Sequence, residues 1–154
     1  MNMKKVITKQ YRENVNRARV QLSGLAVPSE GWIRTVRKAL GMSGAQLARR
    51  IGVTRALISN TEKAELEGGV TLKAMQNMAA SMNCRFVYAI VPEQDIEEIV
   101  HKRALEKARA EVKAASIHMA LEEQALSKNK LEEQIQSLAR EMVDKASSDL
   151  WNDE

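Results

Sequence analysis

Residues 43–65, SGAQLARRIGVTRALISNTEKAE, constrain the fold of this 154-residue chain more than any other stretch. Ser43 and Thr54 are helix-capping residues, and each begins a helical pattern of apolar side chains. Gly52 lies between the two patterns and can adopt the positive φ that a tight turn needs. Ala48 is small enough for two helices to cross closely. We therefore predict two short helices that cross over a miniature core of Leu47, Ile51, Val53 and Ile58.

Such a pair of helices is typical of the helix-turn-helix, whose second helix enters the DNA major groove. The residues predicted to face base edges are Thr54, Arg55, Ala56, Ser59 and Asn60. Arg55 suits a bidentate contact with guanine, and a phosphate contact is the alternative. Asn60 suits adenine or a phosphate, and Ala56 suits a thymine methyl group. A purely structural helical hairpin is the other interpretation of the motif.

Contacts with the DNA backbone are predicted beside these reading residues. The first motif helix begins at Ser43, Gly44 and Gln46, where amides and side chains can meet phosphates. The basic residues predicted to line the same surface are Arg34, Arg37, Lys38 and Lys63. These contacts hold a protein on DNA without reading its sequence.

Two more helices complete a bundle over residues 30–83. Ser29 is predicted to cap a helix that carries Trp32, Ile33, Val36 and Leu40, and Thr71 to cap one whose buried face is Leu72, Met75, Met78, Ala79 and Met82. Aromatic residues make up 3% of the chain, and Ala, Leu, Met and Ile recur throughout. This composition favours helix, so the fold class is predicted as mainly α.

Residues 84–92, CRFVYAIVP, are the one segment predicted as a β-strand, because strand-forming residues run together and Pro92 ends them. A lone strand leaves backbone groups unpaired, and pairing with its copy in a second subunit satisfies them. We therefore predict a homodimer through Cys84, Phe86, Val87, Tyr88 and Ile90. Pairing with a short segment such as VTL, or an extended connector, are the alternatives.

Charge is divided between the two parts of the chain. Residues 1–92 hold 15 Lys and Arg against 5 Asp and Glu, a net +10, whereas residues 93–154 hold 9 against 15, a net −6. The basic part suits a polyanion such as nucleic acid, and the acidic part must serve another purpose. Within the basic part, residues 1–29 are predicted as a helix or as an arm that reaches into the minor groove.

The acidic part, residues 93–154, is predicted as a helical hairpin. A long helix over residues 93–126 and a second over residues 129–147 are separated by SKNK. The second helix has an apolar stripe at 4-3-4 spacing, formed by Leu131, Ile135, Leu138 and Met142. The first helix is rich in alanines that allow close approach of a second helix: Ala104, Ala108, Ala110, Ala114, Ala115 and Ala120. This extension either binds a protein or completes the dimer.

Other classes of protein find little support in the sequence. The single cysteine excludes an internal disulfide, and no stretch approaches the ~20 apolar residues of a membrane span, which is typical of a cytoplasmic protein. Two histidines without a phosphate loop or a nucleophile motif argue against an enzyme. No cofactor is predicted. No metal site is predicted either, because His118, Glu122 and Glu123 lack a second ligand one helical turn away.

The blocks GWIR, LGMS, QLARRIGV, CRFVYAIVP and HMALEEQ occur in this order between Gly31 and Trp151. In this the chain resembles the mobile mystery protein A family, helix-turn-helix proteins of the Xre, lambda-repressor-like class. The resemblance implies a small regulator encoded on mobile elements beside a Fic-type protein, in an arrangement similar to a toxin and antitoxin pair. Two features depart from related patterns: Gly44 stands where many Xre-class domains have glutamine, and Met142 follows Glu141 where Fic inhibitors have Gly or Asn.

Two functions are therefore carried forward. The first is a dimeric DNA-binding repressor of its own operon that is also the antitoxin-like partner of a Fic-type protein, bound through residues 93–154. The second is a protein-binding module that masks a toxin or enzyme without reading DNA. A DNA reader keeps its preference for an operator of two inverted half-sites as salt rises, whereas a masking module has no such preference.

Overall fold

The computed structural model describes residues 2–121, 127–145 and 148–153, with only the backbone of residues 119–121 and 148. The chain divides into two compact units. The first, residues 24–89, is called the central unit. The second consists of residues 1–23 and 90–154 and is called the terminal unit.

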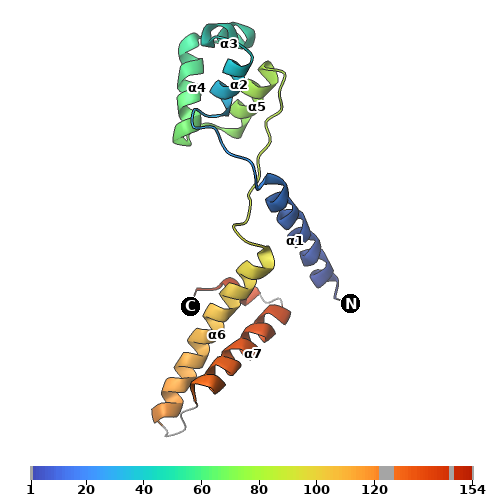
Figure 1. The fold of residues 1–154 in the computed structure, drawn as a ribbon, viewed down its shortest axis with the longest axis vertical. Coiled ribbons are helices and arrows are strands. Elements are labelled where there is room, and N and C mark those ends of the chain that lie inside the picture. Colours follow the sequence, from blue (N-terminus) through green and yellow to red (C-terminus); the bar gives the residue numbers. More distant parts are fainter. Residues whose placement is uncertain (1, 122–126, 146–147, 154) are drawn as a thin grey trace. The chain divides into compact units, whose positions relative to one another are not determined.

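The central unit consists of helices α2 (Trp32–Ala39), α3 (Gly44–Ile51), α4 (Arg55–Glu67) and α5 (Leu72–Ser81) (Figure 1). Three of them begin at predicted caps. The side chains of Ser43, Thr54 and Thr71 each accept a hydrogen bond from the backbone N–H three residues further on. The predicted cap Ser29 is wrong, because α2 begins after Gly31. A glycine has no side chain to cap a helix, so α2 needs another acceptor.

A single core lies between these four helices, and its buried residues are Ile33, Leu47, Ala48, Ile58, Met75, Met78 and Met82. Leu47 and Ile58 are the largest fully buried side chains described. Ala48 is 3% exposed, as its predicted place at the helix crossing requires. Leu72 was expected on the buried face of α5 but is 50% exposed, because the core does not reach the first turn of that helix.

The predicted strand over residues 84–92 is not supported, because the described residues contain no β-strand. A strand needs a paired backbone, and residues 85–91 form no backbone hydrogen bond with any described segment. Phe86 packs against the core and stacks on Tyr88 at a ring-centroid distance of 5.8 Å. Tyr88 and Ile90 are 65% and 93% exposed. The segment is therefore an extended connector in the single chain.

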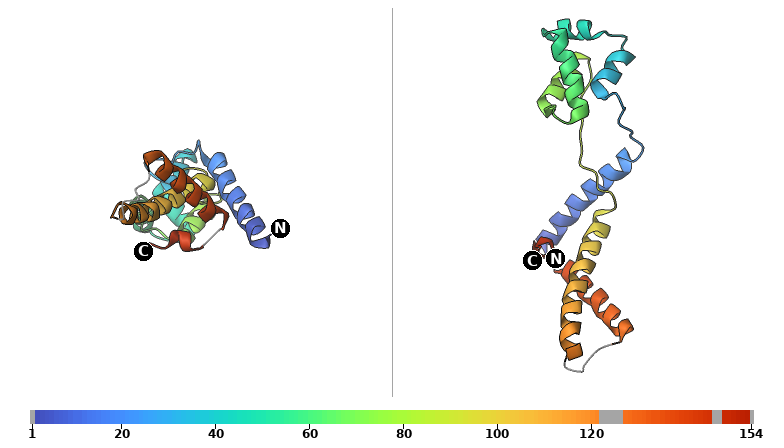
Figure 2. Two further views of the ribbon diagram at one scale, coloured as in Figure 1. Left: turned by 90° about the horizontal axis from the view of Figure 1, so that it is seen from below. Right: turned by 90° about the vertical axis from the view of Figure 1, so that its left-hand side faces the viewer.

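The terminal unit consists of α1 (Met3–Leu22), α6 (Ile96–Leu121), α7 (Lys128–Asp144) and a short 3-10 helix, η1 (Ser148–Trp151). Helices α6 and α7 lie side by side and antiparallel (Figures 1 and 2). Their core contains Val100, Ala104, Ala108, Val112, Ile135, Ala139 and Leu150. Of the predicted alanines on α6, Ala104 and Ala108 are fully buried, Ala110, Ala114 and Ala115 are exposed, and the side chain of Ala120 lies outside the described part.

Helix α1 belongs to the terminal unit although about seventy residues separate its end from α6 in the sequence. The Asn16 side chain accepts a hydrogen bond from the Ile96 N–H at 2.9 Å and donates one to Glu97 Oε2 at 2.8 Å. Arg19 pairs with Asp95 at 3.3 Å. These contacts join α1 to the first turn of α6, and residues 3–22 are helical.

The end of the chain is held on α6 by basic side chains. Arg103 donates from Nε to Leu150 O at 2.8 Å and from Nη2 to Asn152 O at 3.0 Å. Lys107 donates to the backbone oxygen of Asp149. Leu150 is buried in the hairpin core between these contacts. In the part of the chain that the structure describes, no helix has both the length and the apolar character of a membrane span.

Candidate nucleic-acid interface

Helices α3 and α4 are joined by a tight turn at Gly52. Gly52 has a φ of 83°, in the left-handed region, as predicted. Its N–H donates to Ala48 O at 2.8 Å, and the Val53 N–H donates to the same oxygen at 2.9 Å. These two bonds end α3, and Thr54 caps α4 immediately afterwards. The two helices and their turn form a helix-turn-helix.

The first turns of α4 carry the predicted reading residues. Thr54, Arg55, Ala56, Ser59 and Asn60 are all exposed. The helix is fixed in the unit by Ile58, which is 1% exposed, and by Glu62, which is 9% exposed. The structure therefore brings the five residues together at the exposed N-terminal end of α4. Their contacts with bases stay predictions.

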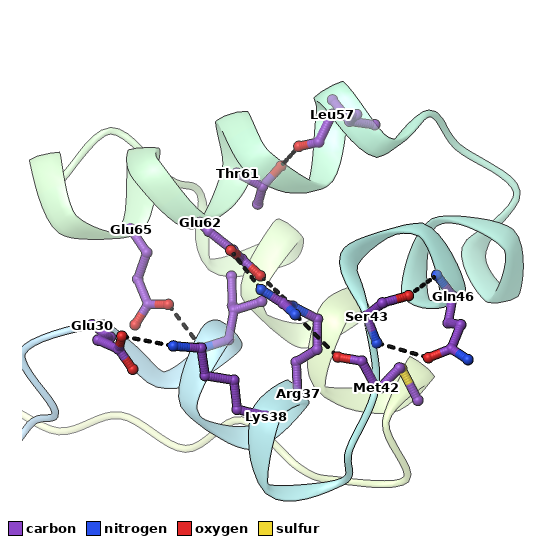
Figure 3. Close-up of polar contacts among 11 residues, drawn as sticks. Glu30, Arg37, Lys38, Met42, Ser43, Gln46, Leu57, Thr61, Glu62 and Glu65 are labelled. Atoms are coloured by element: carbon purple, nitrogen blue, oxygen red, sulfur yellow. Dashed lines mark hydrogen bonds and ion pairs between the residues drawn. The ribbon is translucent and has the colours of Figure 1, made fainter.

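The first turn of α3 is closed by two reciprocal hydrogen bonds, which Figure 3 shows. The Gln46 N–H donates to Ser43 Oγ at 3.1 Å, and the Ser43 N–H donates to Gln46 Oε1 at 2.7 Å. The backbone N–H and the side-chain oxygen of Gln46 are therefore both occupied, and only its side-chain NH2 group can donate a hydrogen bond to a phosphate. Gly44 has open space beside it, because an added Cβ would meet only Ile58 Cγ2, at 4.0 Å.

A groove of about 510 Å³ lies between α2, the start of α3 and α4. The predicted DNA-contacting residues that line it are Arg34, Arg37, Ser43, Gly44, Arg55, Ser59 and Lys63, and the carboxylates of Glu30 and Glu62 line it too. Arg34 and Lys63 are exposed. The groove therefore brings these residues together, and their contacts with DNA stay predictions.

Arg37 was predicted to contact a phosphate, and the structure places its guanidinium inside the unit (Figure 3). It donates from Nε to Glu62 Oε1 at 2.7 Å and from Nη2 to Glu62 Oε2 at 3.2 Å. A third bond runs from Nη1 to Met42 O at 3.0 Å. The Arg37 and Glu62 side chains are only 13% and 11% exposed. Arg37 therefore ties α2 to α4 and to the residue before the Ser43 cap.

Glu65, on the third turn of α4, supplies the acceptor that α2 lacks. Its carboxylate accepts hydrogen bonds from the Trp32 N–H at 2.6 Å and the Ile33 N–H at 3.0 Å. Sequence reasoning missed both Glu62 and Glu65. The signal was present, because Ile58, Glu62 and Glu65 follow one another at 4-3 spacing. Charged residues that continue an apolar stripe indicate buried partners.

The central unit carries a net positive charge, and all of its acidic side chains have partners. The unit holds nine Lys and Arg against four Glu, a net +5. Every one of these glutamates has a partner within the unit: Glu62 and Glu65 as above, Glu30 with Lys38 at 2.8 Å, and Glu67 with Lys63 at 3.9 Å. The hydrogen bond from Lys38 lowers the pKa of Glu30.

Six basic side chains of the unit form no ion pair with any described residue: Arg34, Arg49, Arg50, Arg55, Lys73 and Arg85. Their charge is available to a polyanion.

No group of His, Cys, Asp and Glu among the described residues is placed to hold a metal ion, and Glu122 and Glu123 lie outside those residues.

Comparison with known families matches residues 33–88 to the helix-turn-helix family model. The matched range contains α3, α4 and α5 and nearly all of α2. It covers roughly a third of the chain. No curated protein and no solved structure shows significant similarity to the chain. The match and the geometry agree that the central unit is a helix-turn-helix domain of the kind that DNA-binding regulators use.

Proposed function

We propose that this protein is a sequence-specific DNA-binding transcription regulator and that α4 is its recognition helix. The observation that carries this proposal is the exposed N-terminal end of α4, held from behind by the buried Ile58 and Glu62. Arg55 reads guanine, Asn60 reads adenine, and Ala56 contacts a thymine methyl group. Thr54 and Ser59 complete the reading surface.

Phosphate contacts come from the residues that the structure leaves exposed near α4. The amides at the start of α3, with Ser43, Gly44 and Gln46, meet one phosphate at the positive end of the helix dipole. Arg34, Lys38 and Lys63 meet the neighbouring backbone. Arg37 has a different role here, because its guanidinium holds α2 against α4.

The proposed regulator is a homodimer that represses its own operon through two inverted half-sites. The exposed segment around Val87, Tyr88 and Ile90, whose backbone is unpaired among the described residues, supports a contact between subunits that also includes Cys84 and Phe86. The resemblance noted in the sequence supports an antitoxin-like role toward a Fic-type protein bound through residues 93–154. The existence of a separate terminal unit is consistent with a second partner.

The test is selection of duplexes from a random pool by the purified chain, followed by titration of the selected site and of a random duplex at several salt concentrations. We expect a preference of roughly 10³ or more for the selected site, and affinities for both duplexes that fall as salt rises. Footprinting should show two protected half-sites whose centres are about 34 Å apart, or a multiple of that distance.

Two variants separate reading from positioning. Arg55→Ala should cost about 1–3 kcal/mol and relax the preference at one base pair, whereas Lys63→Ala should weaken all duplexes alike. Equal binding of selected and random duplexes by the unmodified chain would contradict DNA reading. The masking function would then be favoured.

A further inference from the structure

We propose that Glu65 is a positioning residue for DNA reading, and that Gly31 is the glycine that its carboxylate requires. The proposal rests on the proposed function of α4 as the recognition helix. Glu65 belongs to that helix but faces away from its reading end. Its carboxylate holds the Trp32 N–H at 2.6 Å and the Ile33 N–H at 3.0 Å, so it caps a helix that precedes it by about thirty residues.

Gly31 makes this contact possible in two ways. Its φ of 84° lies in the left-handed region, which side chains other than glycine rarely adopt. A Cβ added at Gly31 would lie 2.9 Å from Glu65 Oε1 and 3.0 Å from Glu65 Cδ. The carboxylate therefore sits directly against the backbone, and a Cβ at position 31 would displace it from the Trp32 and Ile33 N–H groups.

Two carboxylates of α4 reach α2, and they attach at different points. Glu62 pairs with Arg37 in the second half of α2 (Figure 3). Glu65 binds the first two N–H groups of α2. The buried Ile58 and the turn to α3 hold the start of α4, and these two carboxylates fix its second half against α2. Arg55 lies ~10 Å along the helix from Glu62, so a small rotation at the attachment becomes a larger displacement at the reading end.

Water cannot readily replace the carboxylate of Glu65. Gly31 is buried, Trp32 is half-buried and Ile33 is 2% exposed. Without Glu65, the N–H groups of Trp32 and Ile33 would be left without an acceptor in a poorly hydrated place. The start of α2 would then shift or fray. Base readout depends on contacts placed within about 0.5 Å, so it should suffer more than phosphate binding.

The experiment uses the full chain with Glu65→Ala, Glu65→Gln and Gly31→Ala. Glu67→Ala and Glu67→Gln are the matched controls, because Glu67 is on the same helix, is exposed and pairs only with Lys63 at 3.9 Å. Each variant is titrated with the selected duplex and with a random duplex at one salt concentration. Amide hydrogen exchange at Trp32 and Ile33 is measured in parallel.

We expect Glu65→Ala to lower affinity for the selected duplex about tenfold while affinity for the random duplex changes less than twofold. Exchange at the Trp32 and Ile33 amides should become faster. Glu65→Gln keeps one acceptor oxygen, so its preference for the selected duplex should lie between those of the unmodified chain and Glu65→Ala. Gly31→Ala should lower the affinity for the selected duplex and speed the amide exchange as Glu65→Ala does. The Glu67 variants lose the same charge and should leave the ratio of the two affinities unchanged.

An unchanged ratio in folded Glu65→Ala would overturn the proposal, as would an equal loss on both duplexes. If Glu65→Ala does not fold, the ratio measured for Glu65→Gln decides. Failure of the proposed function is distinguishable, because the unmodified chain would then prefer no duplex. In that case the faster amide exchange would still show the contact, but Glu65 would have no reading role.

Discussion

The two units of this chain are both helical, yet they bury different kinds of side chain. The core of the central unit is made of large residues such as Leu47, Ile58 and Met75, and a small residue occurs only at the crossing, Ala48. The hairpin of the terminal unit has Ala104, Ala108 and Ala139 fully buried along its seam. Removing side-chain volume should therefore damage the central unit, and adding volume should damage the terminal unit.

Long-range polar contacts also differ between the units. In the central unit, Glu62 and Glu65 turn inward and hold α2. In the terminal unit the corresponding pairs lie at the surface, such as Arg109 with Glu132 at 3.2 Å, where the hydrogen bond from Arg109 lowers the pKa of Glu132. Inward carboxylates fix a geometry on which a reading surface depends, whereas exposed pairs contribute little to stability.

The largest effect is expected for Ile58→Ala, which tests the large-residue core. Ile58 is 1% exposed, so its truncation should cost the central unit about 2–5 kcal/mol. Urea unfolding is followed by the fluorescence of Trp32 in a Trp151→Phe background for the central unit, and of Trp151 in a Trp32→Phe background for the terminal unit. Leu57→Ala is the control, because its side chain is 45% exposed and its loss should matter much less. Equal effects of the two variants would show that Ile58 is not part of a close-packed core.

Ala108→Leu tests the alanine seam and should have the next largest effect. Ala108 is 0% exposed, and extra methylene groups there should force α6 and α7 apart at a cost of about 1–3 kcal/mol. The change should appear in the unfolding of the terminal unit, while DNA affinity per folded central unit stays constant. Ala110→Leu, at an exposed position of the same helix, should be nearly neutral. A stabilised hairpin in Ala108→Leu would mean that the seam holds unfilled space.

The parts of the fold that depend on neighbouring residues could be predicted from the sequence. Ser43, Thr54 and Thr71 cap helices as expected, and Gly52 has the expected left-handed conformation, because each bond involved spans only a few residues. The exposed side of α4 follows from the same periodicity. Local chemistry was sufficient wherever the partner was within one helical turn.

The predictions that failed depended on distant partners. Ser29 was expected to cap α2, but the acceptor comes from Glu65, more than thirty residues later. Arg37 was predicted on the DNA surface, and its partner Glu62 is 25 positions away. The strand expected over residues 84–92 had the right residue types, but strand propensity alone cannot supply a paired backbone.

Asn16→Ala is expected to have the smallest effect, about 0.5–1 kcal/mol, and it tests the surface contacts of the terminal unit. Asn16 caps α6 through the Ile96 N–H and donates to Glu97. The pKa of Glu97 is lowered by its own backbone N–H first and by Asn16 second. The variant should therefore raise the pKa of Glu97 toward its ordinary value, which a carboxyl titration followed by NMR would measure.

The pH dependence of this contact has a definite sign. The pKa of Glu97 is lower in the folded chain than in the unfolded chain. The ionised Glu97 side chain therefore contributes fully to the free energy of unfolding above the unfolded pKa of about 4.3, and this contribution is lost as pH falls through the lower folded pKa. The difference in unfolding free energy between the unmodified chain and Asn16→Ala should therefore be larger at pH 7 than at pH 3. Asn14→Ala removes only a local hydrogen bond from Arg17 at 3.4 Å. The difference in unfolding free energy between the unmodified chain and Asn14→Ala should therefore be the same at pH 7 and pH 3. A difference independent of pH would mean that Asn16 acts through the Ile96 cap alone, and that the exposed carboxylate contributes nothing to joining α1 and α6.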